Sequence, residues 1–429
     1  MQILFLNNKF KIILLISILI IVFYRSPYIF LNGRFVAEEG SFWFRNAFIF
    51  GPIKGLTQIF FGSAYINIWP NISSVFASLV PLEYSPLVTV YFAFVVQLYL
   101  FIYIIFSQSD FLITNFDKLF LSLIVLLSPP MVPAVWLNTL TSQVYFTILS
   151  ILIFFQKDNV NNFFTKSSPV ILLISGLSSM PTCILSPFFI YKYFKNKNRF
   201  NFYNSIAITF STVCQSFVYI YVKINGLELA GIQLRYNISL EKISNYTYNV
   251  LIKSFLGRDL TQTLFYKFLN FINLYILSFF IIILMLFFFK FIFKKIRKDK
   301  TLLSLVLFFL IQTCLAIYAA KLDQVHSRYA VIPGVLLIFI IYRIFQISFG
   351  ALKFFTFSLI MLSLITGSYE YKLNNKYSHY LTCINCPDWK TEVAKWKKDP
   401  TYALKIWAYP GKTMYLHPKL YTHAHLGYT

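Results

Sequence analysis

The sequence predicts an all-α protein that crosses a membrane many times. Hydrophobic residues make up 58% of the 429 residues and charged residues only 12%, which is about half the charged fraction of an average soluble domain. Apolar runs long enough to span a bilayer recur along the chain. Short clusters of Lys and Arg flank these runs, so the net charge of +23 indicates membrane topology and not nucleic-acid binding.

The apolar runs predict about eleven membrane segments. No small-residue cleavage pattern follows the first run, so we interpret it as an uncleaved anchor. The odd number of full spans, roughly nine, puts the N-terminus in the cytoplasm and the C-terminus outside. The full spans are expected at 10–30, 84–106, 118–136, 140–155, 202–222, 264–293, 302–320, 329–345 and 354–366.

The remaining segment, 168–193, is predicted to fold back as a V of two half-helices. A single span would put the basic cluster 192–199 outside, against the positive-inside rule. Gly176, Pro181 and Pro187 interrupt the run at its centre. Broken helices occur at membrane depth only where they line a cavity or are buried in protein.

Two long external loops and a tail complete the predicted organisation. Residues 1–369 form the transmembrane domain, with external loops at 31–83 and 223–262, and residues 370–429 form a small external region. The first loop is rich in Trp, Phe and Tyr, a composition that suits a segment lying at the membrane surface.

The tail contains a close cysteine pair, Cys383 and Cys386. Outside the cytoplasm, a disulfide is one fate for such a pair, and the two-residue spacing also suits redox or zinc sites. A zinc site would need two further ligands, and the histidines of the tail lie far off in sequence. We therefore expect a disulfide and no metal.

The most unusual polar feature is the stretch 35–45, Phe-Val-Ala-Glu-Glu-Gly-Ser-Phe-Trp-Phe-Arg. It holds Glu38 and Glu39, two of only 15 acidic residues, among aromatic side chains. Carboxylates at a membrane edge cost desolvation energy and usually have a function. One interpretation is a catalytic base that faces a lipid-linked substrate. The other is that the two acids open an interfacial helix, 41–50, and complement its dipole.

Candidate phosphate ligands lie in a second polar stretch, 321–329. Its Lys321, His326 and Arg328 are donors suited to a phosphate, Arg by bidentate contact. The alternative is a snorkelling loop whose cations only mark the membrane boundary. Arg258, in the second external loop, is a weaker candidate.

The sequence contains no Gly-rich nucleotide loop, Walker motif or Ser nucleophile elbow. Most candidate polar residues fall in external loops, where ATP and nucleotide sugars are absent. An enzyme working there would take its donor from a lipid carrier.

These features resemble the GT-C class of membrane glycosyltransferases. The stretch Ala-Glu-Glu-Gly-Ser-Phe-Trp-Phe is similar to the Asp/Glu motif of that class. The stretches His-Ser-Arg-Tyr-Ala-Val-Ile-Pro and Cys-Pro-Asp-Trp-Lys-Thr-Glu-Val-Ala-Lys-Trp look like those of uncharacterised bacterial members. In size and composition the chain is most similar to the glucosyltransferases that decorate O-antigen, including phage-encoded serotype-converting enzymes.

The resemblance implies an inverting transferase that needs no cofactor. It would move a sugar, expected to be glucose, from undecaprenyl phosphate to a surface glycan such as the O-antigen of lipopolysaccharide, on the outer face of a bacterial inner membrane. Glu38 or Glu39 would be the base, and Arg328 and His326 would stabilise the leaving phosphate. Many members carry Asp where this chain has Glu38, so the choice between the two acids stays open. A polysaccharide flippase and an O-antigen polymerase are the alternatives.

Overall fold

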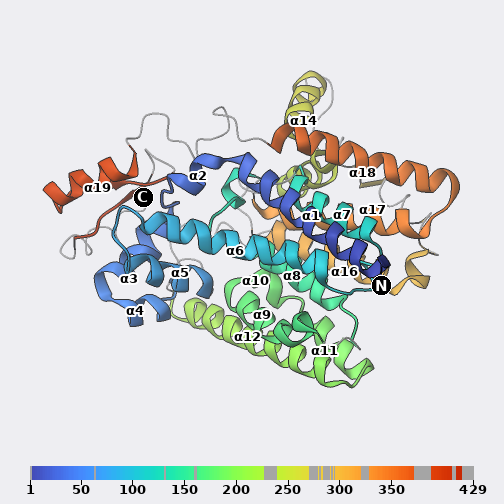
Figure 1. Cartoon of the computed structure of the whole chain (residues 1–429), viewed down its shortest axis with the longest axis horizontal. Helices are drawn as coiled ribbons and strands as arrows, with labels where there is room; N and C mark the ends of the chain where they lie inside the picture. The colour runs from blue at the N-terminus through green and yellow to red at the C-terminus, as the bar shows by residue number, and fades with distance from the viewer. Residues whose placement is uncertain are drawn as a thin grey trace.

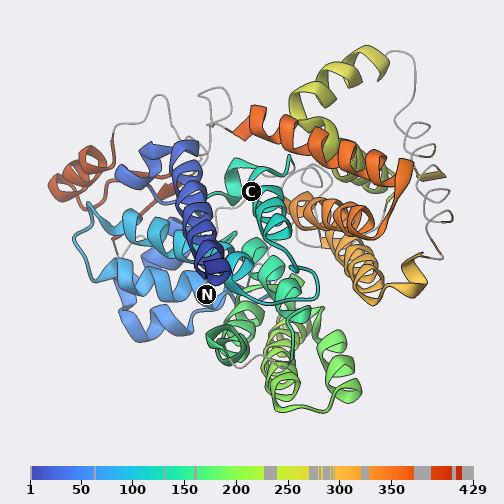
Figure 2. The same ribbon diagram turned by 45° about the vertical axis from the view of Figure 1, so that its right-hand side comes forward.

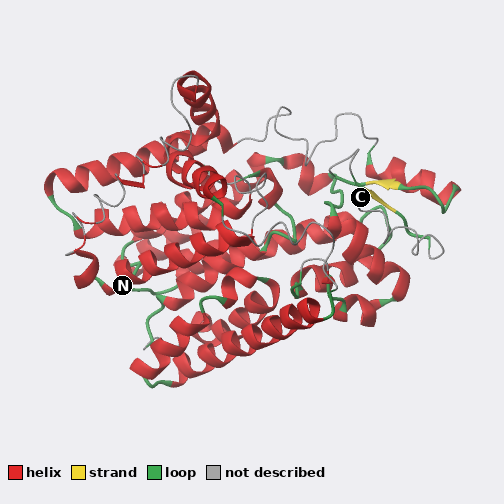
Figure 3. Cartoon of the chain, turned by 180° about the vertical axis from the view of Figure 1, so that it is seen from behind, coloured by secondary structure: helices red, strands yellow, loops and turns green. Residues whose placement is uncertain are grey.

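The computed structural model shows a protein built mostly of helices, and its only described strands lie in the tail (Figures 1 and 3). The structure describes residues 2–61, 64–129, 132–158, 162–226, 239–269, 279, 282–283, 290, 293, 295–319, 328–371, 388–407 and 412–417.

Among these residues, five helices are long and apolar enough to cross a membrane. They are α6 (Ser85–Phe106), α12 (Arg199–Ile224), α16 (Lys300–Ala319), α17 (Val331–Ile347) with the turn that precedes it, and α18 (Gly350–Tyr371). Helix α1 (Gln2–Arg25) adds a sixth long helix. The all-helical membrane class is therefore supported, whereas the number of eleven segments stays a prediction.

One face of α12 carries a stripe of exposed apolar side chains. Their spacing of three and four residues puts them on one side of the helix. Helix α12 itself lies along the lower edge of the molecule in Figure 1. Water would disfavour so much contiguous apolar surface, so the stripe indicates contact with lipid. Its members are Phe210, Val213, Phe217, Ile220 and Ile224.

The chain doubles back before α12. It runs through α9 (Phe163–Ser178), α10 (Met180–Cys183) and α11 (Ser186–Lys195). Pro181 and Pro187 lie in the first turns of α10 and α11, where a helix tolerates proline. The break between α9 and α11 thus falls at the prolines that the sequence singled out.

Asp158 shows that the two arms of this segment return to one place. It lies shortly before α9, and its carboxylate is 3.0 Å from the Lys192 amine at the end of α11. It also accepts hydrogen bonds from Asn198 (3.0 Å) and Asn201 (2.9 Å) at the start of α12. The beginning of α9, the end of α11 and the beginning of α12 therefore meet, as the predicted V requires.

The centre of the molecule is formed by α8 (Gln143–Phe154) and α17, whose residues are almost all buried. Helix α7 (Asn115–Leu127) packs beside them. It ends nine residues before the predicted end of its span, because Pro129 and its neighbours cannot continue a helix. The chain continues as a loop with a 3₁₀ turn at Pro133–Val135, and residues 135–142 of this loop are buried.

The first loop forms short helices at one end of the molecule, on the left in Figures 1 and 2. They are α2 (Pro27–Leu31), a π-helix (Glu39–Phe44), α3 (Arg45–Phe50), α4 (Pro52–Thr57) and α5 (Ile68–Ser78). The predicted interfacial helix at 41–50 is therefore a π-helical turn that continues into α3.

The tail packs on this same end. It contains α19 (Trp389–Lys398) and the antiparallel strands β1 (Leu404–Lys405) and β2 (Thr413–Met414). Trp389 donates its indole N–H to the Leu82 carbonyl at 2.8 Å, and its ring lies edge-on to Phe35. The described part of the tail thus shares one hydrophobic cluster with the first loop.

The second predicted loop is partly helical, with α13 (Leu240–Thr247), a π-helix (Tyr248–Ile252) and α14 (Lys253–Leu269). Most of the predicted span 264–293 lies outside the described residues, and so do Lys321, His326, Cys383 and Cys386.

The lipid contact of α12 gives a first test. Val213, 62% exposed, lies near the middle of the helix, where an Asp would cost about 2.5–3.5 kcal/mol in a bilayer. We expect V213D to reduce the amount of folded protein recovered from membranes, measured by size-exclusion chromatography in mild detergent. Ile224→Asp is the control: this residue is 79% exposed at the helix end, where the charge can reach water. Equal recovery of both variants would contradict a lipid-facing stripe.

Candidate functional site

Glu39 is a buried anchor. Its side chain is 2% exposed, and one carboxylate oxygen accepts the Thr139 backbone N–H at 3.1 Å together with the Thr139 hydroxyl. The other oxygen accepts the Val36 N–H at 3.3 Å. Glu39 therefore joins the acidic stretch to the buried loop before α8, one hundred residues away.

Two opposing effects set the proton affinity of Glu39. Burial raises the pKa of its carboxyl group, and the hydrogen bonds from Thr139, Val36 and Thr89 oppose that rise because they favour the carboxylate. The net result is a pKa above the ordinary value.

Glu38 has a different environment. Its side chain is 32% exposed, and one carboxylate oxygen lies 3.2 Å from the Lys412 amine. Lys412 directly precedes β2, so the tail supplies a cation to the acidic stretch. Of the two acids, Glu38 is the one that a substrate can reach.

A strand-like contact fixes the backbone beside Glu38. The Ala37 N–H donates to the Trp407 carbonyl at 2.7 Å, and the Trp407 N–H donates to the Phe35 carbonyl at 3.0 Å. Residues Val36 and Trp407 form a parallel bridge. The tail therefore holds the acidic stretch through main-chain hydrogen bonds as well as through Lys412.

Arg328, from a distant part of the sequence, interacts electrostatically with Glu38. It opens the turn before α17, and its guanidinium lies 5.5 Å from the centre of the Tyr329 ring. It is close enough to interact electrostatically with both Glu38 and Tyr65. Burial raises the pKa of the Tyr65 phenol, and the Arg328 charge opposes that rise. The structure therefore groups a reachable carboxylate, a phenol and a guanidinium.

Backbone strain is concentrated around this group. Among the described residues, three non-glycine residues have positive φ: Ala37 (46°), Ala64 (54°) and Leu137 (48°). Ala37 directly precedes Glu38, Ala64 directly precedes Tyr65, and Leu137 lies two residues before Thr139. Such conformations cost on the order of 1–3 kcal/mol each and persist only where surrounding contacts impose them.

The acidic stretch is strained in a second way, because it begins a π-helix, Glu39–Phe44. Single π-helical turns are rare and occur frequently at functional sites. Gly40 lies within it, and a Cβ there would come within 2.7 Å of the Phe35 side chain. The geometry that aims Glu38 and Glu39 in different directions thus depends on a tight local fold.

Arg258 lies in a different part of the molecule. It follows Gly257, whose φ of 69° kinks α14, beside Glu370 of α18, which accepts the Asp259 N–H at 2.8 Å.

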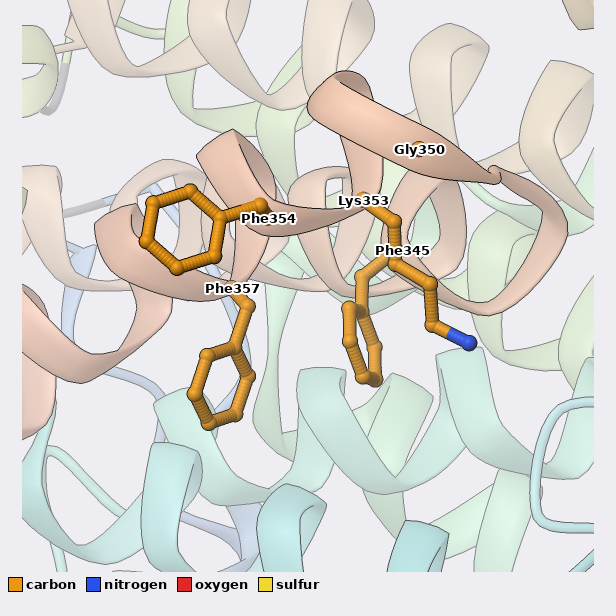
Figure 4. A pocket seen from close by; sticks show the side chains of 5 residues that line it. All are labelled: Phe345, Gly350, Lys353, Phe354 and Phe357. Carbon is orange, nitrogen blue, oxygen red and sulfur yellow. The ribbon is translucent and has the colours of Figure 1, made fainter.

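The cavity in Figure 4 is also separate from the acidic residues. It has a volume of about 300 Å³ and is lined by Phe345, Gly350, Lys353, Phe354 and Phe357. Phe345 lies seventeen residues after Arg328 along one helix, which corresponds to roughly 25 Å. Three aromatic rings and one Lys offer no acid–base pair, so this cavity is not the candidate site.

Tyr65, Thr139 and Lys412 belong to the site but were not identified from the sequence. Thr139 had a usable signal, because it lies in a polar run, Asn-Thr-Leu-Thr-Ser, directly after a proline-broken span. No signal in the sequence indicated Tyr65 or Lys412, because Tyr and Lys are abundant in this chain. Only long-range contacts place these two residues near Glu38 and Arg328.

Comparison with protein families, curated proteins and solved structures finds no match to this chain. Among the described residues, no three His, Cys, Asp or Glu side chains gather as a metal site. The chemistry of the site is that of an acid, a phenol and two cations, Lys412 and Arg328, near the start of an apolar helix.

The raised pKa of Glu39 makes a pH-dependent prediction. The ordinary value is 4.5, so folding takes up a proton at pH values between 4.5 and the higher folded pKa. The free energy of unfolding then falls as the pH rises through this window and is constant above it. Glu39→Gln cannot titrate, so we expect its thermal midpoint in detergent to fall less from pH 4.5 upward than that of the native protein.

Thr139→Val supplies the matching comparison. It removes a hydroxyl that favours the carboxylate, so the folded pKa rises further and the decline should extend to higher pH. Identical pH profiles of all three proteins would show that Glu39 does not titrate in this way.

Proposed function

We propose that this chain is an inverting membrane glycosyltransferase of the GT-C type, which moves a sugar from a polyprenyl-phosphate carrier to a hydroxyl of a surface glycan. The observation that carries the proposal is that Arg328, just before the apolar α17, lies within electrostatic range of both Glu38 and Tyr65. A base and a phosphate ligand at the end of a membrane helix are the two groups that this transfer needs.

Glu38 acts as the base. A general base must reach the acceptor hydroxyl within hydrogen-bond distance, and Glu38 is the partly exposed acid of the pair. Glu39 has both oxygens occupied by Val36 and Thr139, so it positions the stretch instead of taking part in the reaction. The exposure of Glu38 and the hydrogen bonds of Glu39 therefore favour Glu38 as the base.

Arg328 receives the leaving group. Its guanidinium can hold a phosphate through two parallel hydrogen bonds. The Tyr65 phenol, kept protonated by its raised pKa, can donate to a sugar or phosphate oxygen. These side chains thus offer donors to the part of the substrate that gains negative charge.

The transfer is a single displacement. The acceptor oxygen attacks the anomeric carbon as its proton passes to the Glu38 carboxylate. The bond from that carbon to the phosphate oxygen breaks on the opposite face, and the lipid phosphate leaves with the electron pair. The configuration at the anomeric carbon is inverted, as in an inverting glycosidase that uses phosphate as its leaving group.

The proposal includes the orientation and the substrates that the resemblance implies. The end of the molecule that carries α2–α5 and α19 (Figure 1) faces the outside of a bacterial inner membrane, and the N-terminus faces the cytoplasm. The sugar is glucose on undecaprenyl phosphate, and the acceptor is a glycan such as O-antigen. The basic residues at 295–300, beside the far end of α17, support this orientation through the positive-inside rule.

Glu38→Gln is the decisive variant. It keeps the size of the side chain but removes the base, so sugar transfer from polyprenyl-phosphate donor to acceptor should fall about 10²–10⁴-fold. The amount of protein in the membrane should not change, because Glu38 is partly exposed. Transfer is measured in membranes with a labelled sugar on the lipid carrier.

Glu83→Gln is the matched control. Glu83 lies at the same end of the molecule and also pairs with a lysine of the tail, Lys397, but it lies outside the site and its loss should leave transfer unchanged. A flippase would tolerate Glu38→Gln, so full incorporation of sugar by that variant would refute the proposal.

A further inference from the structure

A second cationic group is buried away from Arg328. Arg25 ends α1 and is only 3% exposed. Its guanidinium lies 4.6 Å from the centre of the Trp136 ring and 4.8 Å from that of Tyr371. The three side chains come from α1, from the buried loop before α8 and from the last residue of α18, and the two rings lie 6.1 Å apart.

The described structure gives this guanidinium no carboxylate partner. The groups that interact with it electrostatically are the phenols of Tyr371 and Tyr145. Glu370 is its nearest acid along α18, but that carboxylate caps the backbone of α14 at Asp259. A buried charge without a counter-ion is unfavourable unless something else compensates it. The ring faces supply part of the compensation through cation–π contacts.

Hydrogen-bond donors are left over at the same place. Within the described residues, Arg25 Nε, Trp136 Nε1 and the Tyr371 hydroxyl are buried and make no hydrogen bond within 3.5 Å. The Arg25 guanidinium is close enough to the Tyr371 hydroxyl to interact with its oxygen, which leaves the hydroxyl proton to donate. All three side chains are at least nine-tenths buried. Buried donors are rarely left unpaired in native proteins. Three of them on mutually contacting side chains, one positively charged, indicate a ligand that is negative and rich in acceptor oxygens.

We propose that Arg25, Trp136 and Tyr371 form a binding site for a phosphate group. A tetrahedral oxyanion can accept from all three donors at once, and the guanidinium balances its charge. The inference comes from these three side chains alone and does not rest on the proposed transferase activity.

The surroundings of Arg25 point to the class of phosphate. Phe23 and Tyr24, just before it on α1, are 46% and 55% exposed, which puts apolar surface next to the site. A phosphate monoester on a lipid would have its head at Arg25 and its chain along this surface. Free phosphate shares the same head-group chemistry, so the test must distinguish the two sources.

The site is also connected to the acidic stretch. Trp136 lies three residues before Thr139, which holds Glu39, and the strained Leu137 lies between them. A ligand on Trp136 would therefore stabilise the loop on which the position of the acidic stretch depends.

The test is ligand-dependent thermal stability of the full chain in detergent. Arg328→Gln is introduced into the reference protein, called native below, and into every variant, so that the phosphate ligand of the proposed active site does not contribute. Inorganic phosphate, farnesyl phosphate and farnesol are titrated separately, because a ligand that binds only the folded state raises the thermal midpoint with its concentration. We expect farnesyl phosphate to raise the midpoint of the native protein and farnesol to leave it unchanged.

Tyr371→Phe removes only the unpaired hydroxyl and keeps the ring beside Arg25. It should weaken the apparent affinity for farnesyl phosphate about tenfold, since one hydrogen bond to a charged group is lost. Arg25→Gln should abolish the effect of the ligand. Tyr246→Phe is the control, because its hydroxyl donates to Thr313 at 2.8 Å elsewhere in the bundle, and it should bind as the native protein does.

The outcomes separate the possibilities. A response to farnesyl phosphate that exceeds the response to inorganic phosphate assigns the site to a lipid phosphate, and equal responses assign it to free phosphate. The proposal is overturned if neither phosphate raises the native midpoint, or if Tyr371→Phe responds as strongly as the native protein. The second criterion holds even where Arg25→Gln does not fold.

Discussion

The hydrogen bonds between the Glu39 carboxylate and Thr139 are the constraint on which the candidate site depends. They join the first loop to a buried loop one hundred residues later and leave Glu38 on the accessible side. Because Glu39 is buried, its oxygens must be satisfied by protein donors, and Thr139 supplies two of them. Ala37 and Leu137, two residues before Glu39 and Thr139, both have positive φ, a conformation that is unfavourable for residues other than glycine. One acid is thus buried and held by the protein, while its neighbour stays partly exposed.

Contacts with the tail also hold the acidic stretch in position. The backbone of Trp407 forms a parallel β-bridge with Val36 in the acidic stretch. In addition, Lys412 forms an ion pair with Glu38, and Trp389 packs against Phe35. Main-chain hydrogen bonds fix position more rigidly than a flexible lysine does, so the bridge sets the backbone of Glu38 and Lys412 sets its side chain. Arg328 then approaches from α17, an element whose own position is fixed by near-complete burial. The tail therefore contacts the Glu38 carboxylate, and Arg328 lies within electrostatic range of it.

The sequence predicted the parts that depend on local chemistry. The prolines and the basic cluster of the segment 168–193 indicated the fold-back that Asp158 now demonstrates, because proline and charge rules act over a few residues. The roles of Glu38 and Glu39 could not be separated, since the two differ only in contacts made with Thr139 and Lys412. Helix ends were less predictable from apolar composition alone: α7 stops at Leu127, nine residues before the end of its apolar run, because prolines follow it in the sequence.

A double-mutant cycle tests most directly whether Glu38 and Arg328 form one site. Sugar transfer is measured for Glu38→Gln, Arg328→Gln and the double variant under identical conditions. Groups that act on the same transition state are strongly non-additive, so we predict that the double variant is scarcely slower than the worse single variant. Groups that lie apart and act independently are additive. A double variant whose loss equals the product of the two single losses would contradict a common site.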